Sequence, residues 1–133
     1  MKIKEQSPHR RLLLVDDDYE SCTMMTTMLG CSEYEVIFAQ TMVEGLMLAQ
    51  TLSFDLCLLE SQLSDGSGYE LCQRIHASDV SLPIVFYSGA AYEKDRQHGL
   101  EAGAQAYLIK PSDLDQVEKV ISELIAQAQH TAP

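Results

Sequence analysis

Basic side chains are scarce in this sequence. Its 133 residues include 9 lysines and arginines against 20 aspartates and glutamates, a formal net charge of −11 with histidine neutral. Nucleic acid and anionic membranes repel a surface of that sign. We therefore expect this domain to make no direct contact with nucleic acid or with a membrane.

Paired cysteine motifs and long apolar runs are also missing. There is no C-x-x-C pair and no histidine at a zinc-finger spacing, and the basic start is followed by only four apolar residues, 12–15, before three aspartates. Four apolar residues are too few for a signal-peptide core or a membrane span. The sequence therefore predicts a cytoplasmic protein whose thiols are reduced and pack as small hydrophobic side chains. These thiols are Cys22, Cys31, Cys57 and Cys72.

Neither glycine-rich phosphate loop, G-x-G-x-x-G or G-x-x-x-x-G-K-[ST], occurs, and there is no internal repeat. Nucleotide binding therefore has no support. The chain has the length of one domain, which can bury roughly two thirds of its unfolded surface and needs neither disulfides nor a structural metal to fold. We expect a flexible arm over 1–10, a domain over 11–128, and a tail or the start of a linker over 129–133.

Short apolar runs alternate with segments of helical length. The runs do not alternate with polar residues, which is typical of strands covered on both faces, and they lie at 12–15, 36–39, 56–59, 84–87 and 107–109. Thr41 and Glu44 form a capping-box pattern before the second helix, and Ser112 is the predicted cap of the last. The predicted helices cover 20–29, 42–49, 69–77, 92–102 and 112–127. This pattern predicts an α/β fold in which a parallel sheet is covered by helices on both faces.

Polar residues stand where the predicted strands end, which is where open parallel sheets bind ligands. Asp16, Asp17 and Asp18 follow the first strand, and Glu60 follows the third. Ser88 and Gly89 follow the fourth strand, and Lys110 and Pro111 follow the fifth. One aspartate, Asp18, suits the cap of the next helix, and Glu60 alone could be an ordinary exposed side chain. Together the set predicts a site for a divalent cation and an anionic group, with Lys110 as the counter-charge.

Over about 11–128 the chain resembles the receiver domain of two-component response regulators. The matching stretches are LLVDDD at 13–18, FDLCLLE at 54–60 with Gly68 beyond it, PIVFYSG at 83–89, and GA at 103–104 leading to YLIKP at 107–111. The resemblance implies a flavodoxin-like, doubly wound sheet of order 2-1-3-4-5 with five helices in three α/β/α layers.

The resemblance also implies the role of each site residue. Asp16, Asp17 and the backbone carbonyl of Gln62 would hold Mg²⁺, while Ser88, Gly89 and Lys110 would form the phosphoryl pocket. Tyr107 matches the aromatic residue whose rotation reports the active state, and the Lys110-Pro111 bond would be cis. The implied partners are a histidine kinase, another signalling protein or an output domain. A second copy of the chain could bind through the fourth helix, fifth strand and fifth helix.

Glu60 departs from the family pattern, because it stands where receivers carry the aspartate that accepts phosphate. Its extra methylene moves the carboxylate by about 1.5 Å, and a misplacement of about 1 Å can slow a reaction on the order of a hundredfold. Ser64 and Gly89 also stand where proline and alanine are usual. We therefore predict a receiver that is not switched by ordinary aspartyl phosphorylation, rests in an active-like state and binds divalent cations weakly.

Other functions remain open at this stage. Glu60 itself, or Asp65 in the following loop, could accept phosphate in a working phosphorelay. The acidic cluster could serve a metal-assisted hydrolase on the same scaffold, since fold alone does not decide function. A module with a vestigial site could act only through a fixed binding face. We expect a signalling domain rather than an enzyme.

Overall fold

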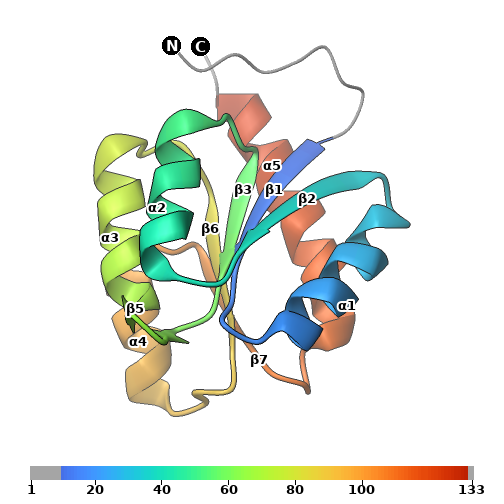
Figure 1. The fold of residues 1–133 in the computed structure, drawn as a ribbon. Coiled ribbons are helices and arrows are strands. Elements are labelled where there is room, and N and C mark those ends of the chain that lie inside the picture. The colour runs from blue at the N-terminus through green and yellow to red at the C-terminus, as the bar shows by residue number, and fades with distance from the viewer. Residues whose placement is uncertain (1–9, 132–133) are drawn as a thin grey trace.

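A five-stranded parallel sheet forms the centre of the computed structural model, which describes residues 10–131 (Figure 1). The spatial order β2-β1-β3-β6-β7 is the predicted order 2-1-3-4-5 when these five strands are counted along the chain. The flavodoxin-like α/β fold class is confirmed. The strands are β1 (Arg10–Val15), β2 (Tyr34–Ala39), β3 (Leu56–Leu59), β6 (Ile84–Ser88) and β7 (Ala106–Ile109).

Helices cover both faces of the sheet (Figure 1). Helices α1 and α5 pack on one face, and α2, α3 and α4 pack on the other, which gives the three predicted layers. The helices are α1 (Tyr19–Gly30), α2 (Met42–Thr51), α3 (Gly68–Ser78), α4 (Glu93–Glu101) and α5 (Val117–Thr131).

The two faces of each central strand contribute to two separate cores. In β1, Leu12 and Leu14 pack with α1 and α5, whereas Leu13 and Val15 pack with α2 and α3. None of these four side chains is more than 3% exposed. Because both faces are covered, the strand sequence is continuously apolar instead of alternating.

Two helix caps expected from the sequence are present. The Asp18 side chain accepts a hydrogen bond from the Glu20 amide at the start of α1, and the Thr41 hydroxyl accepts one from the Glu44 amide at the start of α2. These contacts satisfy amides that have no partner within the helix. Asp18 is thus a capping residue, which was the simpler of its two interpretations.

The last helix begins and ends later than predicted. The Asp113 carboxylate accepts a hydrogen bond from the Ile109 amide at 2.8 Å, which folds the chain back on the strand end. A 3₁₀ turn, η1 (Leu114–Gln116), then leads into α5, so Ser112 is not the cap. Helix α5 continues to Thr131, beyond the predicted end at 127 and into the expected tail.

A short hairpin follows β3 where only a turn was predicted. Its strands β4 (Gln62–Leu63) and β5 (Gly66–Ser67) pair antiparallel. Gly68, the first residue of α3, lies against this connection, since a Cβ atom there would clash with the Glu60 carbonyl oxygen. Only glycine lets the chain pass this close to the end of β3.

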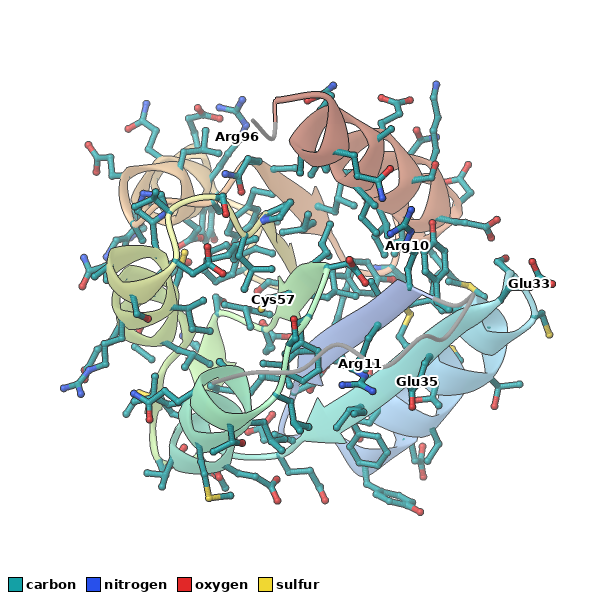
Figure 2. All side chains as sticks on the ribbon, turned by 90° about the horizontal axis from the view of Figure 1, so that it is seen from above. Arg10, Arg11, Glu33, Glu35, Cys57 and Arg96 are labelled. Atoms are coloured by element: carbon teal, nitrogen blue, oxygen red, sulfur yellow. The ribbon has the colours of Figure 1, made fainter. Side chains whose placement is uncertain are left out.

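The amino ends of the strands lie at the edge of the sheet opposite to the carboxyl ends, where the predicted site residues stand. Figure 2 looks onto that end, where Arg11 from β1 and Glu35 from β2 form an ion pair of 3.0 Å.

The arm expected over 1–10 lies outside the described residues, apart from Arg10, which begins β1. Three of the four cysteines are buried, and Cys31 is exposed. Among the described residues no helix is both long and apolar enough to cross a membrane.

Candidate functional site

The residues that follow the parallel strands lie side by side at one edge of the sheet. Backbone hydrogen bonds extend the ladder beyond the strands, since the Glu60 amide donates to the Val15 carbonyl at 2.9 Å and the Lys110 amide donates to the Ser88 carbonyl at 2.8 Å. The side chains after β1, β3 and β7 therefore start from adjacent points and can meet above the sheet.

Lys110 is the centre of this group. Its Nζ lies 2.6 Å from Asp16 Oδ2 and 2.9 Å from Glu60 Oε2. Burial lowers the pKa of Lys110, but hydrogen bonds and charge interactions with the two carboxylates outweigh it and raise the pKa above its ordinary value. The lysine stays charged and neutralises two acids that would otherwise repel each other.

The acidic pair after β1 is divided between two environments. Asp16 is buried, and its second oxygen, Oδ1, accepts a hydrogen bond from the Asp18 amide at 2.9 Å. Asp17 is exposed and faces the open space above the site. Below them, burial and the neighbouring Asp16 raise the pKa of the Cys22 thiol to about 12, so this cysteine stays protonated.

Both carboxylate oxygens of Glu60 have partners. Oε2 pairs with Lys110, and Oε1 accepts a hydrogen bond from the Ser61 amide at 2.7 Å. The Glu60 side chain is only 14% exposed. The carboxylate is therefore held in place by one charged and one backbone donor, which makes it a fixed negative charge at the end of β3.

Two buried hydroxyls adjoin Glu60. The hydroxyl oxygens of Ser61 and Ser88 lie 2.6 Å apart, and the Ser88 hydroxyl also accepts a hydrogen bond from the Ala90 amide. Sequence reasoning missed Ser61. The strand register contains the signal, because Leu59 pairs with Phe86, and continuing this register by two residues places Ser61 beside Ser88.

An open cleft of about 570 Å³ lies above these groups. Of the predicted site residues, Asp17, Glu60, Gln62, Ser88 and Gly89 line it, whereas Asp16 and Lys110 lie outside its lining. Ser61, Leu63 and Ala90 complete the wall. The predicted set is thus split into a cleft wall and an ion-paired layer beside it.

In this arrangement fewer ligands are available to a magnesium ion than the resemblance implies. The resemblance implies Asp16, Asp17 and Gln62 as its ligands, but both oxygens of Asp16 already have partners. Within residues 10–131 no group of three His, Cys, Asp or Glu side chains is arranged to hold a metal. Asp17 and Gln62 remain at the cleft wall, and a tight site would need Asp16 to exchange Lys110 for the metal.

Tyr107 lies inside the fold rather than on its surface. The residue is 8% exposed, and its ring stacks on Phe86 with 5.4 Å between ring centroids. Its hydroxyl donates a hydrogen bond to the Ala90 carbonyl at 2.8 Å, which ties the ring to the wall of the cleft.

One neighbour of this ring, Tyr69, was not singled out from the sequence. Tyr69, at the start of α3, places its hydroxyl 3.2 Å from that of Tyr107, and its own ring stacks on His98 of α4. Burial and the Tyr107 contact raise the pKa of Tyr69, while the nearby Ser61 hydroxyl acts in the opposite direction. Tyr69 therefore stays protonated and able to donate.

Two further expectations concern the loops. The Lys110-Pro111 peptide bond is cis, as the resemblance implied. Asp65, the alternative phosphate acceptor, instead accepts hydrogen bonds from the Met42 and Val43 amides, which lowers its pKa. It caps helix α2 and does not line the cleft, so its place in the structure gives no support to an acceptor role.

Curated relatives that resemble the chain are regulators. It is 37% identical over 107 residues to the nisin biosynthesis regulatory protein NisR of Lactococcus lactis subsp. lactis, covering 80% of this chain and 46% of that protein. It is 31% identical over 119 residues to the cell cycle response regulator CtrA of Brucella ovis, covering 90% of this chain and 51% of that protein. The chain thus spans about half the length of these relatives.

Solved structures give the same result over nearly the whole fold. A CheY-like response regulator receiver domain protein from Methanospirillum hungatei JF-1 has a TM-score of 0.88 at 29% identity, covering 93% of this chain and 99% of that one. The non-phosphorylated HemR receiver domain from Leptospira biflexa has a TM-score of 0.80 at 31% identity, covering 87% and 94%. The family description "Response regulator receiver domain" matches residues 12–122. This chain belongs to the receiver domain family of two-component response regulators.

Proposed function

We propose that this receiver domain signals without ordinary aspartyl phosphorylation, because Glu60 occupies the acceptor position and its charge is already bound. The observation that carries the proposal is the pairing of both Glu60 oxygens, with Lys110 at 2.9 Å and with the Ser61 amide at 2.7 Å. In the family the lysine at the position of Lys110 would otherwise pair with an incoming phosphoryl group.

The chemistry of transfer supports the same conclusion. Phosphoryl transfer requires an acceptor oxygen held in line with the donor, while a metal ion and a lysine neutralise the developing charge. Here Lys110 is shared between Glu60 and Asp16, and the Glu60 oxygen nearest to it would have to leave an ion pair before attack. The longer side chain also fills space that a phosphoryl group needs. Mg²⁺ binding at Asp17, Asp16 and Gln62 is accordingly weak.

The position of Tyr107 supports an active-like resting state. In the resembling family the rotation of this aromatic residue reports activation, and here its ring is buried and bonded to the Ala90 carbonyl. The output would pass through protein contacts with a histidine kinase, another signalling protein or an output domain. The face formed by α4, β7 and α5 could also receive a second copy of the chain. We expect no direct role in nucleic-acid binding for this domain.

Incubation of the full chain with acetyl phosphate and Mg²⁺, followed by intact-mass measurement, tests the proposal. We expect no addition of a phosphoryl group to the wild type. The variant Glu60→Asp is the matched control, because it restores the shorter acceptor beside the same Lys110 and Asp17, and we expect it to gain one group. Rapid stoichiometric modification of the wild type at Glu60 would overturn the proposal and favour a working phosphorelay.

A further inference from the structure

The inward Tyr107 ring is held by contacts with α4, with β6 and with the connection between β6 and α4. Gly99 of α4 makes room for it, since a Cβ atom at that position would lie 2.7 Å from Tyr107 Cδ2. Phe86 stacks against one side of the ring, and the Ala90 carbonyl accepts the proton of its hydroxyl. These contacts allow the inward position, but they leave the acceptor lone pairs of the hydroxyl available.

The number of hydroxyl protons determines which tyrosine donates in the contact between Tyr69 and Tyr107. Tyr107 has one hydroxyl proton, and it is donated to the Ala90 carbonyl at 2.8 Å. The 3.2 Å contact between the two tyrosine hydroxyls must therefore use the proton of Tyr69, with the Tyr107 oxygen as acceptor. If Tyr107 rotated outward, the half-buried Tyr69 hydroxyl would lose this acceptor.

Tyr69 is itself fixed from two sides. Its ring stacks on His98 with 3.9 Å between ring centroids and an angle of 17°, and it lies 5.2 Å from Phe86. Its amide donates to the Ser67 hydroxyl at 3.0 Å, which anchors the first turn of α3. Tyr69 is thus a rigid donor, so little further side-chain entropy is lost when it binds Tyr107.

We propose that Tyr69 is a positioning residue that holds the Tyr107 ring inward by donating a hydrogen bond to its hydroxyl. The contact joins the start of α3 to β7 and, through Ala90, to the connection between β6 and α4. It gives the inward ring an additional contact between two side chains that do not themselves line the cleft. The inference rests on the proposed function only in taking the inward ring as the signalling state.

The variant Tyr69→Phe tests this, because it removes the hydroxyl and keeps the ring that stacks on His98. In the full chain labelled with ¹³C at the tyrosine rings, the Tyr107 resonance is assigned with Tyr107→Phe, and its contact with Gly99 is followed by the nuclear Overhauser effect. We expect the ratio of inward to outward ring to fall about two- to tenfold, the effect of losing one neutral hydrogen bond. The Tyr107 resonance should move toward the position of an exposed tyrosine, and the Gly99 contact should weaken.

Two further variants make the result decisive. Tyr92→Phe removes a hydroxyl from a tyrosine that is 75% exposed and should leave the Tyr107 resonance unchanged. Gly99→Ala fills the space of the ring and provides the spectrum of the displaced state. A Tyr107 resonance and Gly99 contact that are the same in Tyr69→Phe as in the wild type would overturn the inference, as would a wild-type ring that already lies outward. Phosphorylation of the wild type in the mass experiment would instead overturn only the proposed function.

Discussion

Replacing Lys110 by methionine removes the positive charge that two acids share. In the wild type its Nζ lies 2.6 Å from Asp16 and 2.9 Å from Glu60, and the lysine side chain is 21% exposed. The Asp16 side chain is only 5% exposed and would keep a single amide donor. Methionine preserves most of the side-chain volume, so the variant tests charge rather than packing.

The expected cost is a substantial part of the stability of the domain. Removing one partner of a buried ion pair costs about 3–5 kcal/mol, and the partial exposure of Lys110 favours the lower end, about 3 kcal/mol. With a urea dependence of about 1–3 kcal/mol per molar, the unfolding midpoint should fall by roughly 1–3 M. Urea unfolding at pH 7, followed by circular dichroism, measures this shift.

A double-mutant cycle separates the ion pair from other effects. Asp16→Asn removes the uncompensated charge, so Asp16→Asn combined with Lys110→Met should lose less than the sum of the single variants. Lys119→Met, on the exposed face of α5, is the matched control and should lie within about 0.5 kcal/mol of the wild type. If Lys110→Met lost less than about 1 kcal/mol, Lys110 could not be holding the two carboxylates as argued.

The stability difference between the wild type and Lys110→Met should depend on pH with a definite sign. The folded pKa of Lys110 is raised, so its contribution to stability is fully present below the ordinary lysine pKa of about 10.4 and is lost as the pH rises through the folded value. The difference in unfolding free energy between wild type and Lys110→Met should therefore be constant from about pH 6 to 9 and shrink above about pH 10.5. A difference that grew at alkaline pH would contradict the assignment.

Three other expectations follow from single contacts. Cys31 is the one exposed thiol, so a chromogenic disulfide reagent at neutral pH should modify one thiol quickly, and Cys31→Ala should abolish that phase; two fast thiols would contradict the burial of the rest. Asp65→Ala should speed hydrogen exchange at the first two amides of α2, because the wild-type carboxylate accepts hydrogen bonds from both. The pKa of Asp65 is lowered in the folded protein, so the stabilisation by this carboxylate should be lost as the pH falls through the folded pKa. Gly68→Ala should cost more than about 2 kcal/mol in urea unfolding because its Cβ would meet backbone, whereas Gly30→Ala, with no atom within 4 Å, should be neutral or stabilising; equal effects would contradict the close approach.

The sequence predicted the sheet because buried parallel strands need apolar residues on both faces. The run at 56–59 coincides with β3, and the runs at 12–15 and 84–87 lie within β1 and β6. The last helix was placed too early because Ser112 is a favourable cap by composition. The competing contact between Asp113 and the Ile109 amide, which depends on how the chain leaves β7, decided its start.

The candidate site was predictable at the level of strand ends, but its internal contacts were not. Parallel strands bring the residues after β1, β3 and β7 to one edge, whatever their rotamers. Lys110 binds both Asp16 and Glu60, whereas Asp17 is left at the cleft. This arrangement depends on side-chain directions that no sequence pattern encodes. The Tyr69–Tyr107 contact joins residues 38 positions apart and depends on the rotation of α3 about its axis.

The most direct test follows the Ser88 and Tyr107 amides of ¹⁵N-labelled protein while acetyl phosphate and Mg²⁺ are added. Our proposal is that Glu60 takes the place of a phosphoryl group while Tyr107 rests inward, so the wild-type resonances should stay where they are. Those of Glu60→Asp should move as its shorter carboxylate is modified. Movement of both amides in the wild type, reversed when the donor is consumed, would contradict a receiver that is independent of phosphorylation.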